Sequence, residues 1–307
     1  MTPCVAISMG DPLGIGPEVV ALALTDLKVR AVLDPVVFGD KATLQRAARL
    51  RDVPFEARVV QVGRVSAQPS AEEAGAAAID YVDRAARTVV AGEAKALCTA
   101  PLSKERVALR RPGFVGHTEY LAAMAGSPTV MMMAGPRLRV VLATNHLRLS
   151  EVPQRISAEK IGFVIDVAAQ GLRERFGIER PRIAVCGLNP HAGDRGLFGD
   201  EEVRIVAPAV ETARAKGLDV TGPHPADGVF PHAARGEYDA VVALYHDQGL
   251  IPAKLLDFEE TVNVTLGLPW PRTSPDHGTA DDIAWQGKAD PHPMISALLL
   301  AARLLHR

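Results

Sequence analysis

Three histidines lie where a catalytic metal could be bound. His146, His191 and His246 each follow a strand-like apolar run that ends in a polar turn. Neutral imidazole is a common ligand of zinc and similar ions, and three protein ligands with one open position are typical of a metal that polarises a substrate oxygen. Asp247 is a candidate further ligand or hydrogen-bond partner. The residues alone leave a second interpretation open, in which each histidine is an ordinary hydrogen-bonded loop residue.

The elements that must position these histidines alternate along the chain. Short apolar runs predict buried strands, and between them apolar residues recur at the three- and four-residue spacing of helices. The alternation predicts an α/β fold with a largely parallel sheet, where ligands bind at the carboxyl ends of the strands. The predicted strands are Val5–Ser8, Val36–Phe38, Ala96–Thr99, Val140–Thr144, Ile183–Gly187 and Ala240–Tyr245, and the predicted helices are Glu72–Val90, Ala158–Phe176 and Glu202–Lys216.

Two local patterns add detail to this fold. Thr129–Met133 and Leu138–Ala143 flank a turn that contains Gly and Pro, which predicts a hairpin on a second lobe. Gly14–Val19 lacks the third glycine of a dinucleotide fingerprint, and no phosphate-loop lysine follows it. We therefore expect a strand-to-helix turn there, with Pro17 at the first helical position and Glu18 near the positive end of the helix.

Composition indicates an ordinary globular protein that acts on a small molecule. At 307 residues the chain is about twice the ~150-residue domain norm, so two lobes are expected. A net charge of −2 and 5% aromatic residues argue against a dedicated nucleic-acid binder. Cys4, Cys98 and Cys186 form no Cys-x-x-Cys pair, which fits a reducing compartment. Without a membrane-length apolar segment, we expect a cytoplasmic protein.

Seven motifs resemble, in family order, the 4-hydroxythreonine-4-phosphate dehydrogenases of pyridoxal-phosphate biosynthesis. The resemblance extends over nearly the whole chain, and Tyr245-His-Asp-Gln-Gly-Leu-Ile-Pro252 is one of its most specific segments. The others are Gly10–Pro17, Gly116–Glu119, Ala143–Leu147, Gly187–Gly193, Val262–Pro269 and Arg272–Thr279.

The resemblance implies a set of site residues and a reaction. It implies that His146, His191 and His246 bind one divalent metal, with zinc preferred and magnesium, cobalt or manganese as alternatives. It also implies a homodimer whose site combines residues of both subunits. The substrate, 4-hydroxythreonine 4-phosphate, would be oxidised to a β-keto acid and decarboxylated to 3-amino-2-oxopropyl phosphate. The implied substrate-binding residues are His117, Thr118, Lys254, Asn263 and Arg272, and the unranked candidates for proton transfer are Asp247, His117 and Lys254.

A second resemblance concerns the nucleotide. His277–Ala284 and Gly287–Asp290 are similar to the adenosine-binding loop of isocitrate and isopropylmalate dehydrogenases. It implies two α/β/α lobes with a cleft between them and a non-Rossmann NAD site, with NADP as the alternative. Residues 1–117 with 268–307 would form the nucleotide-side lobe, and residues 118–267 the metal and dimerisation lobe. The implied cofactor contacts are Gly278, Thr279, Asp281 and Asp282, where either carboxylate could bind ribose hydroxyls; without the resemblance, a capped turn explains these residues equally well.

Some positions depart from the family pattern and leave the substrate open. Asp194–Leu197, Asn145 and Pro269–Pro271 stand where other residues are usual. A paralogous dehydrogenase for threonate or erythronate 4-phosphate, or for a carboxylated cis-dihydrodiol, is therefore an alternative. A non-redox relative, either a ligand-binding protein or an acyltransferase-like enzyme, is a more distant one.

Overall fold

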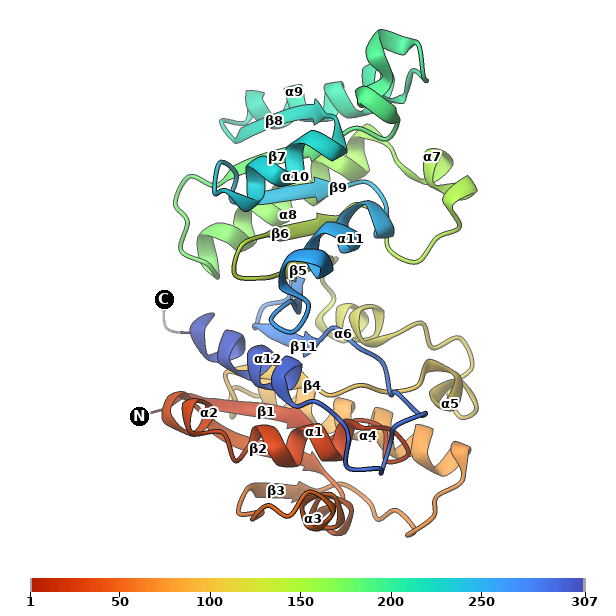
Figure 1. Cartoon of the computed structure of the whole chain (residues 1–307), viewed down its shortest axis with the longest axis vertical. Coiled ribbons are helices and arrows are strands. Elements are labelled where there is room, and N and C mark those ends of the chain that lie inside the picture. The colour runs from red at the N-terminus through yellow and green to blue at the C-terminus, as the bar shows by residue number, and fades with distance from the viewer. Residues whose placement is uncertain (1, 306–307) are drawn as a thin grey trace. The chain divides into compact units, whose positions relative to one another are not determined.

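The structure, a computed structural model, describes residues 2–305, and these divide into two compact units. The first unit extends to Ser127 and resumes at Leu268, and the second spans Pro128–Gly267. In Figure 1 the blue C-terminal segment returns to the red and orange elements of the first unit. The first lobe was expected to end at residue 117. It continues to Ser127 because Leu121 packs in the same core as Phe38. Residues 1, 306 and 307 of the expected lobe lie outside the described residues.

The first unit contains a parallel sheet with the strand order β3-β2-β1-β4-β11. Its C-terminal strand β11 pairs with β4, with Arg272 opposite Leu97, which brings the end of the chain beside its beginning. The elements are β1 Cys4–Ser8, α1 Gly16–Ala23, α2 Leu27–Val32, β2 Asp34–Gly39, α3 Lys41–Leu50, β3 Arg58–Gln61, α4 Ala71–Val90, β4 Ala96–Thr99, α5 Lys104–Ala108, α6 His117–Ala125, β11 Arg272–Pro275 and α12 His292–Arg303.

Helices cover this sheet because its strands are apolar on both faces. Ala6 and Phe38 pack with Ile79 and Val82 of α4 in one buried cluster. Side chains alternate along a strand, so the buried Ile7 points to the other face. Helix α12 packs against β4 and β11. Burial on both faces is typical of parallel sheets.

The second unit contains a mixed sheet with the strand order β10-β5-β6-β9-β7-β8. Strands β6, β9, β7 and β8 are parallel, whereas β5 is antiparallel to both of its neighbours. The β5–β6 pair confirms the predicted hairpin. The elements are β5 Val130–Ala134, β6 Arg139–Leu142, η1 Leu149–Glu151, α7 Val152–Arg155, α8 Ala158–Glu174, β7 Arg182–Cys186, η2 Pro190–Gly196, η3 Glu202–Val206, α9 Ala207–Ala215, β8 Asp219–His224, α10 Ala226–Ala234, β9 Ala240–Ala243, α11 His246–Asp257 and β10 Val262–Leu266.

Two groups of helices cover the second sheet. Phe230 of α10 and Leu250 of α11 share a buried cluster with Val140 and Val241 of the central strands. Helix α8 packs against β5, β6, β9 and β10, and its buried Ile161 lies outside that cluster. Buried side chains that alternate between the two faces hold β6, β9 and β7 in register.

The mixed α/β fold expected from the sequence is confirmed. Each of the six predicted strands corresponds to an observed one, and α4 and α8 match the predicted helices closely. The predicted helix Glu202–Lys216 begins as a π-helical turn before α9. Helix α1 begins at Gly16, so Pro17 is its second residue and not its first as predicted, whereas Glu18 lies in the first turn as expected. Within residues 2–305, no helix combines the length and apolarity needed to span a membrane.

Candidate active site

Three parallel strands of the second unit end at one edge of its sheet, and a candidate metal ligand follows each strand. Parallel pairing places the carboxyl ends of β6, β9 and β7 together. His146 follows β6, His246 is the first residue of α11 after β9, and His191 lies in η2 after β7. The predicted strand-end position of all three histidines is thus the observed one.

His146 and His246 are brought into contact by a close approach of helix to strand. Their ring centroids lie 5.4 Å apart. Helix α11 can lie this near to β6 because residue 249 is glycine: a Cβ there would stand 2.6 Å from Cγ1 of Val140. Real Cβ atoms do not approach other atoms so closely, so the glycine permits the packing that pairs the two imidazoles.

Asp247 orients the ring of His246. Its Oδ1 lies 2.6 Å from Nδ1 of His246. An ionised carboxylate only accepts hydrogen bonds, so Nδ1 carries a proton, and in the neutral imidazole the lone pair is then on Nε2. Histidine ligands are commonly held in this way by a carboxylate on the nitrogen that does not bind the metal. Asp247 therefore orients His246 through Nδ1 and is not itself assigned as a metal ligand.

The His191 loop has an unusual backbone. His191, Ala192, Asp194 and Arg195 have φ values of 54°, 53°, 40° and 57°, and Gly193 lies between them at 80°. The left-handed region disfavours a residue with a Cβ by about 1–2 kcal/mol each, so other contacts must hold the loop in place.

Glu202 provides those contacts. Its side chain is buried, and Oε1 accepts hydrogen bonds from the backbone N–H groups of Leu188 and Asn189, both at 2.7 Å. Oε2 accepts a third bond, from the side-chain amide of Asn189, at 3.1 Å. The carboxylate thus fixes the start of the segment that carries His191.

The histidine pair suits a divalent metal, but the described residues of one chain bring no complete ligand set together. Two neighbouring imidazoles are suitable ligands for zinc, cobalt and similar ions. Within residues 2–305, however, no three His, Cys, Asp or Glu side chains gather closely enough to hold an ion. The structure brings His146 and His246 together, and it places His191 on the neighbouring strand end without completing a site.

In the first unit, the buried Arg272 acts electrostatically on His117, a partly buried residue whose Nε2 is buried. Arg272 lies in β11 with 2% exposure, and its Nη2 donates to Oγ1 of Thr99 at 2.6 Å. Burial lowers the pKa of Arg272 to about 10, so the guanidinium stays charged at neutral pH. His117 and the buried Thr118 open helix α6, whose N-cap Gly116 has no capping side chain. A free helix N-terminus beside a guanidinium favours an anionic ligand.

His117 is electrically neutral in this setting. Burial, followed by the positive charges of Arg272 and Lys104, holds the pKa of His117 well below its ordinary value. Its Nε2 is buried and has no hydrogen-bond partner among residues 2–305. A buried polar nitrogen without a partner is unfavourable by about 1–3 kcal/mol, and a ligand that bonds to it would remove that penalty.

Lys254 and Asn263, the other two predicted substrate residues, lie in the second unit. Lys254 is on α11, eight residues after His246, which places its Cα about 12 Å further along the helix. Its Nζ is 6.0 Å from the ring centroid of Phe258. Asn263 pairs with Met133 in the sheet, and its Oδ1 is buried without a hydrogen-bond partner in the described part of the chain.

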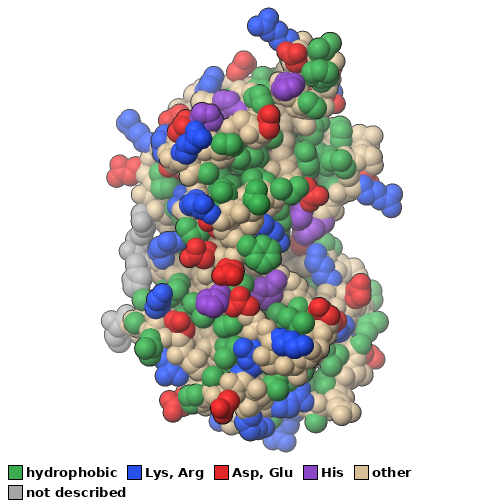
Figure 2. Space-filling model, viewed as in Figure 1, with side chains coloured by type: hydrophobic (Ala, Val, Ile, Leu, Met, Phe, Trp, Pro, Cys, Tyr) green, Lys and Arg blue, Asp and Glu red, His purple; other side chains and the backbone are tan. Residues whose placement is uncertain are grey.

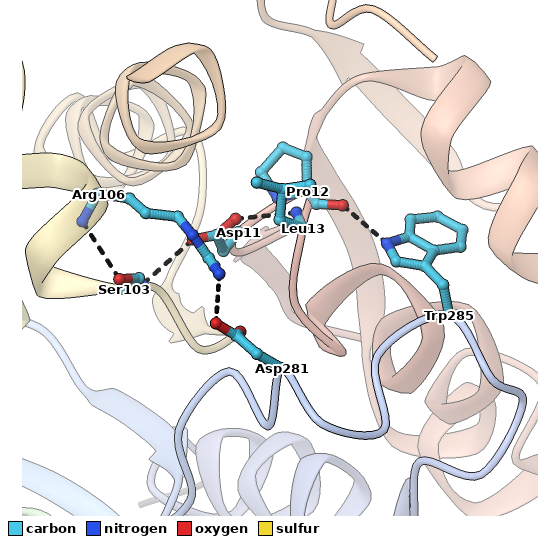
Figure 3. Close-up of polar contacts among 7 residues, drawn as sticks. All are labelled: Asp11, Pro12, Leu13, Ser103, Arg106, Asp281 and Trp285. Atoms are coloured by element: carbon cyan, nitrogen blue, oxygen red, sulfur yellow. Dashed lines mark hydrogen bonds and ion pairs between the residues drawn. The ribbon is translucent and has the colours of Figure 1, made fainter. Parts of the chain in front are cut away.

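The candidate nucleotide loop connects β11 to α12 and packs against the turn after β1. The carbonyl of Thr279 accepts a hydrogen bond from Ile15 N at 3.0 Å. Around Gly278, a Cβ would meet no protein atom within 4 Å, so a cofactor has space to approach this backbone. Figure 3 shows that Asp281 points to Arg106, with which it forms an ion pair, whereas Asp282 is exposed to solvent.

Sequence reasoning missed five residues that shape these sites. Thr99 and Lys104 flank Arg272 and His117, Asp11 and Arg106 lie under the nucleotide loop, and Glu202 holds the His191 loop. For Thr99 a signal was present, because it ends a predicted strand. Arg106 and Glu202 are charged residues within helical patterns, where a solvent-exposed position is the usual expectation.

Comparisons with known proteins identify the family and several relatives of this chain. Residues 31–301 match the family model described as "Pyridoxal phosphate biosynthetic protein PdxA". The chain is 45% identical over 322 residues to a 4-hydroxythreonine-4-phosphate dehydrogenase of Desulforapulum autotrophicum, covering 98% of this chain and 95% of that protein. It is 44% identical over 326 residues to a D-threonate 4-phosphate dehydrogenase of Salmonella typhimurium, covering 99% of each.

A solved structure extends the likeness to three dimensions. The crystal structure of a 4-hydroxythreonine-4-phosphate dehydrogenase from Klebsiella pneumoniae matches with a TM-score of 0.89 at 41% identity. The match covers 100% of this chain and 99% of that one.

Proposed function

Because the chain belongs to the PdxA family of pyridoxal phosphate biosynthetic proteins, we propose that it oxidises 4-hydroxythreonine 4-phosphate with NAD. It is a dehydrogenase that acts on a hydroxyl group. The product of oxidation is a β-keto acid, which then loses carbon dioxide to leave 3-amino-2-oxopropyl phosphate. The hydride goes to the nicotinamide and the hydroxyl proton to a base of the protein.

The buried Arg272 is the observation that best supports this substrate. The guanidinium is almost completely removed from water, carries a positive charge and donates to Oγ1 of Thr99, and a buried cation of this kind is stabilised by an anion. A phosphate or carboxylate satisfies the guanidinium with paired, charge-assisted hydrogen bonds. The N-terminus of α6 adds backbone donors beside it. We propose Lys254 and Asn263 as the remaining substrate-binding residues, as the family resemblance implies.

Among the three candidates for proton transfer, His117 is the best placed chemically. Its lowered pKa leaves the imidazole neutral at pH 7, so Nε2 can accept a proton or a hydrogen bond. Asp247 is already bonded to His246. Lys254 carries three donors and no acceptor while it is charged. We assign the base to His117 and the ordering of His246 to Asp247.

The metal would be held by His146, His191 and His246. When bound, a divalent ion, with zinc the first choice over magnesium, cobalt and manganese, acts as a Lewis acid on the hydroxyl that is oxidised and on the carbonyl formed from it. The protein's own contribution is to hold two imidazoles with their ring centroids 5.4 Å apart and to orient one of them through the hydrogen bond between Asp247 and Nδ1 of His246.

A second copy of the chain would supply the third ligand. Beside Asp247, a groove of about 580 Å³ between α10 and α11 is lined mainly by apolar side chains. Ile251 and Leu255, which line the groove, are 64% and 84% exposed, and Phe258 at the end of α11 is 71% exposed. Figure 2 shows hydrophobic side chains gathered over this face. Burying such side chains contributes about 1.5–3 kcal/mol each. We propose that a homodimer forms through this face and that the His191 loop of the second copy completes the site of His146 and His246.

A complementation experiment tests the shared metal site. His191→Ala and His246→Ala should each abolish NADH formation in metal-supplemented assays. After the two variants are mixed and reassociated, about half of the dimers are mixed, and each mixed dimer regains one intact site of two. About a quarter of the wild-type activity should therefore return. Activity that stays absent in verified mixed dimers places the three ligands in one chain, and near-wild-type turnover by folded His191→Ala removes its role altogether.

D-threonate 4-phosphate is a second candidate substrate. The Salmonella typhimurium relative that bears its name is as similar as several relatives named for 4-hydroxythreonine 4-phosphate. The two acids differ in one group, since an ammonium in the first is replaced by a hydroxyl in the second. Values of kcat/KM for both acids, with NAD and with NADP, decide between them. A preference of about tenfold or more corresponds to at least 1.4 kcal/mol in the transition state.

A further inference from the structure

The segment between β11 and α12 has no helix or strand of its own, yet several side chains hold it in place. Trp285 donates its backbone N–H to the buried Glu18 at 2.6 Å and its indole N–H to the carbonyl of Pro12 at 2.9 Å. The guanidinium of Arg46 lies 3.8 Å from the indole centroid. All of these partners lie in the first unit, and Figure 3 shows the loop beside the turn after β1.

The loop stores backbone strain that these contacts must offset. Ala280 and Trp285 have φ values of 45° and 61°, in the left-handed region. A residue with a side chain is disfavoured there by about 1–3 kcal/mol. Asp281 and Asp282 lie between these two residues, so the direction of their carboxylates depends on how firmly the loop is held.

Arg106 links this loop to the protein interior. It lies in helix α5, which begins after Ser103. Its Nη1 donates to Oδ2 of Asp11 at 3.0 Å, and its Nη2 donates to Oδ2 of Asp281. Asp11 is fully buried and also accepts hydrogen bonds from the N–H groups of Leu13 and Ser103, at 2.9 and 3.3 Å. One guanidinium thus bridges a buried carboxylate and an exposed loop.

Asp281 and Asp282 differ in whether their carboxylate oxygens are available to accept hydrogen bonds from a ligand. The carboxylate of Asp281 is neutralised by Arg106, although 53% of its side chain is exposed. Binding ribose through Asp281 would compete with that ion pair. The side chain of Asp282 is exposed, and its carboxylate makes no ion pair or hydrogen bond within residues 2–305. Its acceptors are therefore available to a pair of hydroxyl groups.

We propose that Arg106 is a positioning residue for the nicotinamide cofactor: it anchors the loop through Asp281, so that Asp282 faces the adenosine ribose. This inference rests on the proposed use of NAD at this loop. A preorganised loop improves binding by lowering the ordering penalty. Loss of the anchor therefore raises KM for the cofactor and leaves kcat nearly unchanged. A carboxylate at the ribose accepts from its hydroxyls and repels a 2′-phosphate, so Asp282 also sets the preference for NAD.

The test compares Asp281→Asn with its neighbour Asp282→Asn. Dissociation constants for NAD and NADP are measured by calorimetry on both variants and on the wild type. Asp281→Asn should weaken both cofactors by the same factor, about five- to tenfold, because it acts through the loop. Asp282→Asn should weaken NAD while leaving NADP unchanged or tighter. Arg106→Lys keeps the positive charge but cannot bond Asp11 and Asp281 through two separate nitrogens, so its cofactor affinities should resemble those of Asp281→Asn.

A second readout is independent of the cofactor. Trp285 and Trp270 are the only tryptophans, so in a Trp270→Phe background the emission reports on the loop. Asp281→Asn should make Trp285 more accessible to acrylamide quenching, and Asp282→Asn should not. Unchanged cofactor affinity in Asp281→Asn, or a shift of its NAD-to-NADP ratio, overturns the inference while NAD use stands. A wild-type protein that binds neither cofactor overturns the proposed function, and this inference with it.

Discussion

Replacing Glu202 by Gln should loosen the His191 loop and weaken metal binding. In the wild type, Oε1 accepts two backbone hydrogen bonds and Oε2 accepts one from Asn189. Hydrogen bonds to a charged group contribute about 1.5–3 kcal/mol, and those between neutral groups about 0.5–1.5. Gln keeps an acceptor for the two backbone bonds, so the two together lose about 2 kcal/mol. The side-chain NH₂ group of the introduced glutamine also faces the side-chain NH₂ group of Asn189. Both groups are donors, so the hydrogen bond between them is lost.

The expected total is a fall of about 2–3 kcal/mol in the free energy of unfolding. Urea unfolding of the chelator-treated protein measures this quantity. Metal affinity, followed by calorimetry, should fall about tenfold or more, as is usual when the support of a ligand is removed. Glu201→Gln is the matched control. Glu201 accepts a single bond from Asn189, at 2.8 Å, and it is less buried, so its loss should remain within about 0.5 kcal/mol.

Two results would refute this reasoning. A loss of stability below about 1 kcal/mol in Glu202→Gln would mean that the carboxylate does not hold the strained loop. If the free energy of unfolding falls by the expected amount while metal affinity is unchanged, the loop does not carry a metal ligand. Gly193 offers an independent check, because a Cβ there would lie 2.6 Å from Oε2 of Glu202. Gly193→Ala should therefore reproduce both losses.

Three further predictions concern the other sites. Leu255→Glu should convert a dimer to a monomer in light scattering and abolish metal binding, whereas Leu27→Glu, at a leucine of similar exposure in the first unit (80% against 84%), should do neither. The pKa of His117 in the folded protein lies below the value of about 6.5 that an exposed histidine has. As the pH falls, His117 is therefore protonated in the unfolded chain before it is protonated in the folded protein. The free energy of unfolding has its full value above about pH 6.5 and decreases as the pH drops toward the folded-state pKa. His117→Gln should make the melting temperature less dependent on pH below about 6.5, and an unchanged dependence would contradict the lowered folded-state pKa of His117. Gly278→Val should leave the melting temperature within a few degrees of wild type, because space surrounds this position, but should raise the dissociation constant of NAD; unaltered NAD affinity would show that the cofactor does not approach there.

Several parts of the fold could be predicted because they depend on local pattern. The apolar run Ala240–Tyr245 predicted a strand, and β9 is fully buried. The Ala134–Arg137 turn between two apolar runs predicted the β5–β6 hairpin. Strand β3 was not predicted because it lies at the edge of the sheet, where none of its side chains is fully buried and the apolar signal is weak. The π-helical start of Glu202–Val206 has the same apolar spacing as an ordinary helix and could not be distinguished from one.

The candidate sites also combine features that local sequence predicts with features that depend on contacts between distant residues. The sequence by itself determined that His146, His191 and His246 follow strands, because the polar turn and the apolar run are adjacent in the chain. Only the tertiary structure decided that two of the three rings meet, since their contact depends on the close packing of Gly249 against Val140. Likewise, the sequence placed two aspartates in the nucleotide loop but could not rank them. The ion pair of Asp281 with Arg106 distinguishes them, and that partner lies 175 residues away. Spacing along a chain constrains local conformation, whereas contacts between distant residues depend on how whole helices and strands pack.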